Sequence, residues 1–227
     1  DSKSIIFAVL AALSALGLAA VAIVRESSSR RTGAARSLIP RIAIPQAAMG
    51  PFLRAVPVAV AVWMAGGVYL SVVGETARDL LAVGDEFATS MLIAGLSAVG
   101  AVAVVLSQRL RSRTGARFGS LLIALGMLMG IIAIFSHSVV VLVIGTVVSG
   151  SGFGMAFAGA VGLVIPHARA HERGEVFAAI YVVNYVAFGV PAIAAGLLIT
   201  PLGLTTAVLL YAAAITAVAA TGLAVQS

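Results

Sequence analysis

The chain has 227 residues, of which 61% are hydrophobic and only 10% are charged, and its mean hydropathy is +1.15. A soluble domain is about half apolar and about a quarter charged, so this composition excludes an ordinary water-soluble fold and favours a protein whose solvent is the bilayer. The net charge of +6 comes from arginines between apolar runs, which indicates membrane topology and no nucleic-acid partner, and the lack of cysteine excludes a disulfide framework and Cys-ligated metal sites.

Seven apolar segments approach or exceed the length that a helix needs to cross the hydrocarbon core, which is about 20 residues. None of them contains Asp, Glu, Lys or Arg, and strand-like alternation is absent. The sequence therefore predicts an all-α integral membrane protein with seven transmembrane helices. In chain order the segments are 5–24, 55–74, 87–107, 118–136, 139–165, 176–199 and 202–225.

The first segment, 5–24, has a second interpretation as a secretory signal peptide, because the Ala-Val-Ala at 20–22 resembles a cleavage site. Its apolar run is longer than a signal core of about 7–15 residues. Arginines follow the run, and only Lys3 precedes it. We therefore expect a transmembrane helix over 1–24.

The residues that follow, 25–54, form the only long connector. Their first part contains the polar stretch SSSRRTGAARS, and Pro40, Pro45 and Pro51 punctuate the rest. Proline removes a backbone donor and disfavours helix at the residue before it, so one continuous helix is not expected here. We predict a basic cytoplasmic linker over 25–54 that joins the first helix to a six-helix domain over 55–227.

The basic residues gather on one predicted side of the membrane. The connectors 25–54, 108–117 and 166–175 hold 12 of the 14 lysines and arginines, whereas the connector 75–86 is acidic. The positive-inside rule assigns the arginine side to the cytoplasm. We therefore expect a multi-pass protein of the cell (plasma or inner) membrane, with the N-terminus of this chain outside and the C-terminus in the cytoplasm.

The six-helix domain has two very short connectors. Residues 136–138 and 200–201 leave room only for tight turns, so the helices on either side should run antiparallel and adjacent. The domain also divides into two triplets of helices, 55–136 and 139–225. Inverted three-helix repeats are a feature of transporters.

The stretch TVVSGSGFGMAFAGAVG, residues 146–162, has the glycine density of a nucleotide-binding loop. A dinucleotide fingerprint fails because Phe157 stands where the third glycine belongs, and a Walker loop fails because no lysine is near. A serine peptidase would need an intramembrane histidine beside Ser151, but all three histidines lie in connectors. We predict no catalytic residue, no cofactor, no metal site and no enzyme activity.

Small residues in this stretch follow helical spacing instead. Gly145, Ser149, Gly152, Ala156 and Gly159 recur at spacings of four, three, four and three, which places them on one helix face. In lipid, such a face lets two backbones approach closely. The pattern predicts a transmembrane helix that packs tightly and that could slide or bend.

The chain after these glycines carries a family resemblance. The G-x-G-F-G start at 150–154 is followed by an H-E-R-G turn at 171–174, and together they resemble the tenth and eleventh helices of the major facilitator superfamily (MFS). Residues 61–81 are similar to the seventh helix of its bacterial drug-efflux-like members, and the Leu-Gly-Leu at 202–204 resembles the entry to its twelfth. The eleventh-helix pattern Y-x-x-x-G-x-P-x-x-x-x-G is formed by Tyr185, Gly189, Pro191 and Gly196.

The connector 108–117, QRLRSRTGAR, resembles the MFS loop G-x-L-x-D-R-x-G-R-R between the eighth and ninth helices. Gln108, Ser112 and Ala116 depart from the pattern, so the charge lock made by the family's aspartate is not implied. The matching residues are Leu110, Arg113, Gly115 and Arg117.

The resemblance covers nearly the whole chain and implies its place in a larger protein. MFS members have twelve helices in two six-helix domains, so residues 1–24 would be the sixth helix, 25–54 the interdomain linker and 55–227 the C-terminal domain. The chain would then be a fragment that lacks its N-terminal half and does not transport alone. The implied activity is alternating-access transport, with drug or hydrophobic-compound efflux as the closest match, and the implied partners are the lipid bilayer and a small-molecule substrate.

In this family the substrate cavity lies between the two domains, and polar groups in apolar helices are often functional. Asn184 offers two donors and an acceptor, although an interhelical hydrogen bond is the alternative role. Trp63 and Tyr69 could line the cavity or only pack and anchor at the interface. The cavity candidates are Trp63, Tyr69, Tyr181, Asn184, Tyr185 and Phe188, of which the last four fall at i, i+3, i+4 and i+7. The gating candidates are Arg113, Gly115, Arg117, Gly152, Gly154 and Pro191.

Two other functions share this topology. A seven-helix receptor would also have an outside N-terminus, and a membrane scaffold would need no transport at all. A light-driven retinal protein would need a lysine in its last helix, but Lys3 is the only lysine of the chain.

Overall fold

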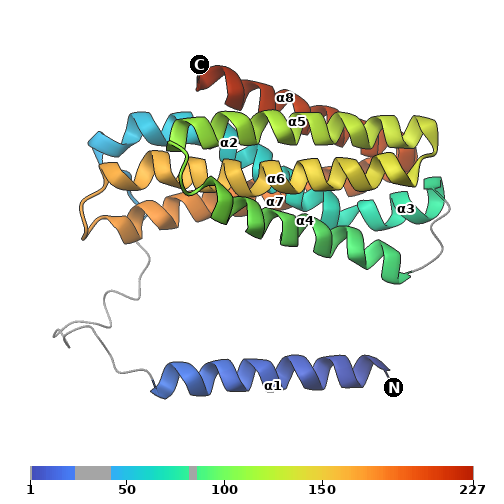
Figure 1. Cartoon of the computed structure of the whole chain (residues 1–227), viewed down its shortest axis with the longest axis horizontal. Helices are drawn as coiled ribbons and strands as arrows, with labels where there is room; N and C mark the ends of the chain where they lie inside the picture. The colour runs from blue at the N-terminus through green and yellow to red at the C-terminus, as the bar shows by residue number, and fades with distance from the viewer. Residues whose placement is uncertain (1, 24–41, 82–85, 227) are drawn as a thin grey trace. The chain divides into compact units, whose positions relative to one another are not determined.

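The computed structural model describes residues 2–23, 42–81 and 86–226, and every regular element in these ranges is helical (Figure 1). The chain divides into two compact units, Asp1–Pro40 and Arg41–Ser227. In the first unit the described element is α1 (Ser2–Ile23). The second unit contains α2 (Gln46–Ser71), α3 (Val73–Leu81), α4 (Glu86–Ser107), α5 (Ser112–Ser136), α6 (Val139–Val164), the 3₁₀ helix η2 (Ile165–His167), α7 (Arg173–Leu202) and α8 (Leu204–Val225).

The lengths of these helices confirm the predicted fold class. In the second unit, α2, α4, α5, α6, α7 and α8 are long and apolar enough to cross a membrane, and α1 adds a shorter apolar stretch over Phe7–Ile23. The protein is therefore an all-α membrane protein of about seven helices. Within the described ranges, each predicted apolar segment falls on one of these helices.

The predicted start of the second helix, at residue 55, is wrong. Helix α2 begins at Gln46 after Pro45, and both Pro51 and Pro57 lie inside it. Each proline removes one backbone hydrogen bond, but the helix continues because its face, which includes buried Phe52, packs into the core of the second unit. The rest of the predicted linker falls mostly on residues 24–41, outside the described ranges.

The predicted connector 75–86 is also helical over its first part. Helix α2 ends at Ser71, and α3 follows after a single break at Val72, whose φ and ψ are −127° and −17°. Backbone hydrogen bonds continue through the break, since Val72 N donates to Val68 O at 3.0 Å and Thr76 N donates to Val72 O at 2.9 Å. The break therefore redirects the helix without ending its bonding pattern.

The short turns are partly as predicted. At 136–138, His137 adopts a left-handed conformation with φ 49°, and the hydroxyl of Ser138 caps α6 by accepting from Val141 N at 3.4 Å. The predicted turn at 200–201 is wrong, because α7 continues to Leu202 and the turn is made by Gly203 with φ 80°. Glycine adopts this conformation without the steric cost of a Cβ, so the turn forms there.

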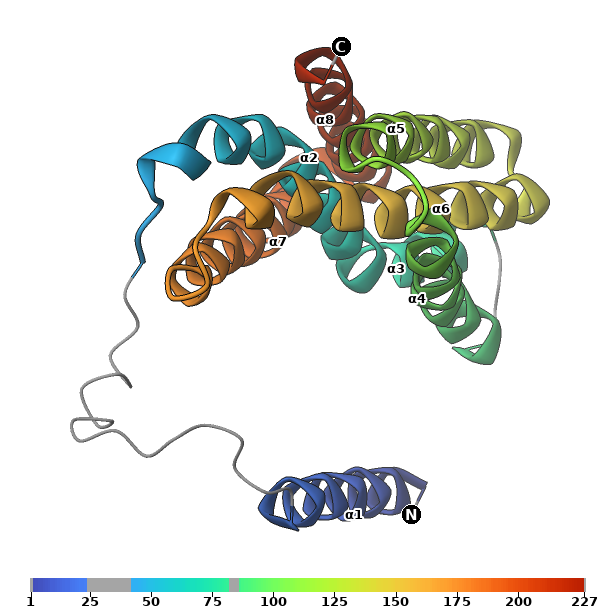
Figure 2. The same cartoon turned by 60° about the vertical axis from the view of Figure 1, so that its left-hand side comes forward.

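The small residues of α6 lie against two different helices, as Figure 2 illustrates with α6 passing between α5 and α4. A Cβ on Gly152 would lie 2.6 Å from Ile123 N of α5, and one on Gly150 would lie 2.7 Å from Leu96 O of α4. Both distances are shorter than van der Waals contact, so the backbones approach as closely as glycine allows. The predicted close-packing face is confirmed.

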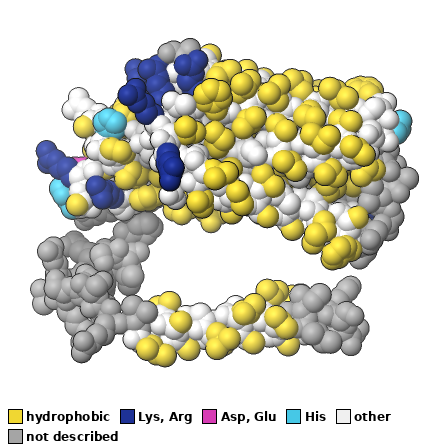
Figure 3. All heavy atoms as spheres, in the orientation of Figure 1, with side chains coloured by type: hydrophobic (Ala, Val, Ile, Leu, Met, Phe, Trp, Pro, Cys, Tyr) yellow, Lys and Arg dark blue, Asp and Glu magenta, His cyan; other side chains and the backbone are white. Residues whose placement is uncertain are grey.

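All but one of the described arginines of the second unit gather at one end of the bundle, where α2, α5 and α7 begin and α4, α6 and α8 end. Figure 3 shows this basic end beside a largely apolar flank. We call it the arginine end, and its arginines are Arg54, Arg109, Arg111, Arg113, Arg117, Arg169 and Arg173. The remaining described arginine, Arg78, lies in α3 at the other end and pairs with Glu75 at 3.0 Å.

Candidate functional site

An aromatic cluster joins the middle of α2 to α6 and α7. The indole ring of Trp63 lies at its centre, with ring centroids 6.2 Å from Phe153 and 6.3 Å from Phe157 of α6. On α7 the corresponding distances are 6.3 Å to Tyr185 and 6.2 Å to Phe188. The three pairs with phenylalanines are edge-to-face, and such pairs stabilise beyond their burial by about 0.5–1.5 kcal/mol each, so the cluster holds three helices together.

The indole nitrogen of Trp63 is a buried polar group of this cluster. Nε1 is buried and has no hydrogen-bond partner among the residues that the structure describes. Nearby, a Cβ on Gly66 would lie 3.4 Å from the Phe153 ring, so the neighbouring backbone approaches the same cluster. A buried donor without a partner is costly, which makes Nε1 a candidate for a bond to a ligand or to water.

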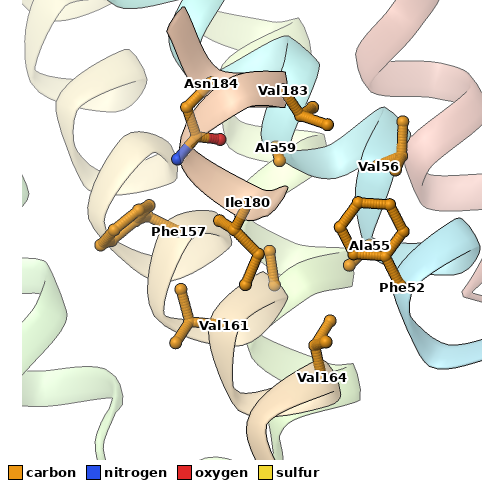
Figure 4. A pocket seen from close by; sticks show the side chains of 11 residues that line it. Phe52, Ala55, Val56, Ala59, Phe157, Val161, Val164, Ile180, Val183 and Asn184 are labelled. Atoms are coloured by element: carbon orange, nitrogen blue, oxygen red, sulfur yellow. The ribbon is translucent and has the colours of Figure 1, made fainter. Parts of the chain in front are cut away.

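Asn184 lies beside this cluster in a small pocket between α2, α6 and α7. Its side chain is 1% exposed, and neither Oδ1 nor Nδ2 has a partner within the described ranges. Figure 4 shows its amide among otherwise apolar side chains, including Phe157, which also contacts Trp63. The lining residues are Phe52, Ala55, Val56, Ala59, Phe157, Ala160, Val161, Val164, Ile180, Val183 and Asn184.

The pocket around Asn184 has a volume of about 20 Å³. A cavity needs at least about 10–15 Å³ by this measure to hold one water molecule, so the pocket accommodates a water and not a drug-sized compound. Small-molecule sites usually measure about 300–1,000 Å³. The six-helix unit therefore carries the polar groups of a site but not, by itself, an enclosed cavity at Asn184.

The predicted stripe on α7 is divided by packing. Tyr181 and Tyr185 stack on each other with centroids 6.2 Å apart, and they are 49% and 67% exposed. Asn184 faces the core instead, while Phe188 is half-buried against Trp63. The four residues thus form a band that runs from the exposed surface of α7 to the buried amide.

Tyr69 does not join the cluster. It is buried between α2 and α6, and its hydroxyl donates to Thr146 Oγ1 at 3.0 Å, while that threonine donates to Leu142 O at 2.9 Å. This is an interhelical hydrogen bond of the packing kind. The structure thus places Tyr69 in a bonded pair apart from the Trp63 aromatic cluster.

The residues predicted to gate lie at helix contacts, in the interior of α7 and in the first turns of α5. Gly152 and Gly154 are contact points of α6 with α5 and α4, and Pro191 lies inside a helix that runs without interruption from Arg173 to Leu202. Gly115 packs its backbone on α6, since a Cβ there would lie 3.4 Å from Met155 O. The remaining two, Arg113 and Arg117, lie in the first two turns of α5, because that helix begins at Ser112 inside the predicted connector.

Sequence reasoning missed Gln226. Its side chain is 1% exposed, and Nε2 donates to Arg54 O of α2 at 2.8 Å. Its backbone oxygen accepts from Arg113 Nε of α5 at 2.7 Å. These two bonds, which we call the Gln226 clasp, tie the end of α8 to α2 and α5. A lone glutamine beside the chain's last residue gives no periodic signal, so only the packed structure reveals it.

The chemistry available at the Trp63–Asn184 region is binding, through ring faces, one amide and one indole N–H. In the parts of the chain that the structure describes, no cluster of His, Asp or Glu could hold a metal ion. Comparison with protein-family models, curated proteins and solved structures found no match to this chain.

Proposed function

We propose that this chain is the C-terminal part of a secondary transporter of the MFS type, with α1 as the helix before the interdomain linker. In this role the second unit supplies one wall of the substrate path, and the transporter exports small hydrophobic compounds by alternating access. The Trp63 cluster and Asn184 contact the substrate. The N-terminal half of the transporter supplies the opposite wall, and the pair, not this unit alone, completes the cavity.

The observation that carries the proposal is the unpaired amide of Asn184. Polar groups in membrane-spanning helices are expensive and usually face a partner, a pathway or a cavity. Here Oδ1 and Nδ2 find no partner among the described residues, and the indole N–H of Trp63, one aromatic ring away, is in the same condition. Two unsatisfied groups on either side of the Phe157 ring suit an apolar substrate with a few polar atoms.

The exposed stack of Tyr181 and Tyr185 also supports the proposal that the substrate binds at this face of α7. These rings cover the surface of α7 next to the buried amide. Aromatic side chains offer large contact area at low entropy cost, and their faces also attract organic cations. An exported compound could therefore pass from the ring faces to Asn184 and Trp63.

The distribution of arginines supports a cytoplasmic assignment for the arginine end, because positive residues favour that side. On this assignment the C-terminus is cytoplasmic and the N-terminus of the chain is outside. During the transport cycle, α6 moves with α4 and α5 as one body, since glycine contacts on both sides leave little room for sliding. Pro191 and the break at Val72 are then the points where α7 and the α2–α3 helix bend.

The test is drug efflux from cells that carry the full reading frame from which this chain derives. Ethidium accumulation is measured for the wild type, for Asn184→Leu and for a control, Ser120→Ala. Ser120 is matched because its hydroxyl is also buried and has no partner among the described residues, but it lies at the α5–α8 contact, away from the cluster. Losing a hydrogen bond worth about 1–3 kcal/mol should lower the efflux rate of Asn184→Leu by roughly 5- to 150-fold.

Asn184→Leu should retain or raise the unfolding midpoint, because an apolar side chain of similar size replaces an unpaired amide. Unchanged efflux in this variant, or an equal loss in Ser120→Ala, would remove Asn184 from the substrate path. If the wild type exports neither ethidium nor any other lipophilic cation of a test panel, the receptor or scaffold functions would be favoured instead. The reading frame upstream of Asp1 should encode five further transmembrane helices, and their absence would contradict the two-domain proposal.

A further inference from the structure

A second and larger hollow lies on the flank formed by α5 and α8. It has a volume of about 400 Å³ and lies at the arginine end of these two helices, well apart in sequence from the Asn184 pocket. This volume falls within the range of about 300–1,000 Å³ that small-molecule sites occupy. We call it the α5–α8 groove, and it is lined by Thr114, Arg117, Phe118, Leu121 and Leu223.

The polar and apolar residues of this groove are separated along α5. Thr114 and Arg117 lie in the first two turns of the helix, whereas Leu121 lies one turn further into the span, so the polar end coincides with the arginine end. Phe118, which is 55% exposed, and Leu223 of α8 form the apolar sides. A cation at the mouth and apolar walls beyond it are complementary to an amphipathic anion.

Contacts beside the polar end of the groove fix the end of α8 to α2 and α5. The Gln226 clasp ties the end of α8 to Arg113 at 2.7 Å and to Arg54 at 2.8 Å. One turn before, Gly222 packs against α5 and α2, because a Cβ there would lie 3.1 Å from Ser120 Oγ. The walls are therefore set by bonds outside the groove, and a ligand does not have to create the space.

We propose that the α5–α8 groove holds one anionic phospholipid. The guanidinium of Arg117 and the hydroxyl of Thr114 bind the phosphate, and one acyl chain lies along Phe118, Leu121 and Leu223. An arginine binds phosphate through two parallel N–H donors, and its long side chain reaches the headgroup level from within the span. Basic pockets between membrane helices on the arginine-rich side suit such headgroups.

Charge complementarity favours this occupant over others. The groove opens among the arginines of one bundle end, so an anionic headgroup is attracted and a cationic or zwitterionic one gains less. Its apolar walls need an acyl chain as well, and a free phosphate would leave them uncovered. The lipid site stands independently of transport, because none of its lining residues belongs to the Trp63 cluster or the Asn184 pocket.

The experiment is native mass spectrometry of the full chain purified in detergent, titrated with phosphatidylglycerol. Phosphatidylcholine with the same acyl chains tests the headgroup, and glycerol 3-phosphate tests the headgroup without chains. Arg117→Gln removes the phosphate contact, and Leu223→Trp fills the apolar part while keeping the charge. Arg169→Gln is the matched control, since it removes one arginine from the same end but outside the groove.

One phosphatidylglycerol should remain bound to the wild type at concentrations where phosphatidylcholine and glycerol 3-phosphate do not. Arg117→Gln should weaken this binding about tenfold or more, the effect of losing a charge-assisted hydrogen bond. Leu223→Trp should weaken it as well, and Arg169→Gln should leave it unchanged.

Equal losses in Arg117→Gln and Arg169→Gln would overturn the proposal, because the attraction would then belong to the whole basic end. Equal binding of phosphatidylcholine would overturn it too, since the headgroup charge would be irrelevant. Binding of glycerol 3-phosphate as tight as that of the lipid would identify a phosphate site without a lipid. If Arg117→Gln does not fold, Leu223→Trp decides: unchanged phosphatidylglycerol binding in that variant would place the lipid elsewhere.

Discussion

The backbones of α5 and α6 approach closely at Gly152, and Gly152→Ala tests how much this contact matters. An added Cβ would lie 2.6 Å from Ile123 N, 2.7 Å from Gly119 O and 2.9 Å from the Leu122 side chain. Two of these neighbours are backbone atoms of a regular helix, so rotation of a side chain cannot relieve the overlap. The two helices must separate instead.

The size of the effect follows from the distances. Favourable contact between heavy atoms needs about 3.5–4.0 Å, so α5 and α6 would have to move apart by about 1 Å at Gly152. Gaps of about 0.5–1 Å forfeit a quarter to a half of the dispersion energy of a contact, and overpacking of this kind costs about 1–3 kcal/mol. The higher helix propensity of alanine relative to glycine offsets up to about 1 kcal/mol of this loss.

The matched control is Gly130→Ala on α5, where an added Cβ would meet nothing within 4 Å. Both variants gain the same propensity term, so the difference between their unfolding free energies isolates the overpacking. Gly152→Ala should be less stable than Gly130→Ala by about 1–3 kcal/mol. Unfolding is followed by SDS titration in mixed micelles, with the fluorescence of Trp63, the single tryptophan, as the signal.

Gly130→Ala should be as stable as the wild type or more stable. The reasoning is refuted if the two alanine variants have the same unfolding midpoint. Such a result would mean that the α5–α6 contact adapts without loss, and the small residues of α6 would then have no packing role.

Two further predictions use the same unfolding titration. Tyr69→Phe should lower the free energy of unfolding by about 0.5–1.5 kcal/mol, because it removes the hydrogen bond to Thr146 Oγ1. Tyr211→Phe should be neutral or stabilising, because the buried hydroxyl of Tyr211 has no partner within the described ranges. Equal losses in both variants would contradict this prediction. Gln226→Ala should lower the free energy of unfolding by about 1 kcal/mol, because it removes the hydrogen bond to Arg54 O. It should also speed amide hydrogen exchange in the last turns of α8. Unchanged exchange there would show that the clasp does not hold the helix.

The sequence by itself determined the helices and the packing character of one of them. A membrane span needs about 20 apolar residues whatever surrounds it, so each predicted segment in the described ranges recurs as a helix. The spacing of the small residues in α6 also predicted that they form a close-packing face, because spacings of three and four put residues on one face of a helix whatever its neighbour. What that spacing could not say is that α5 lies against Gly152 and α4 against Gly150.

The tertiary structure alone decided where faces point and where helices begin. Periodicity places Tyr181, Asn184 and Tyr185 on one stripe, but packing of α2 and α6 buries the asparagine and leaves both tyrosines exposed. Because proline disfavours helix, the sequence predicted that α2 begins at residue 55. The helix in fact includes Pro51, because burial of Phe52 stabilises it there. The reason is the same in each case. The helical repeat fixes how side chains are arranged around one helix, whereas contacts with residues distant in sequence decide which side of that helix faces the core.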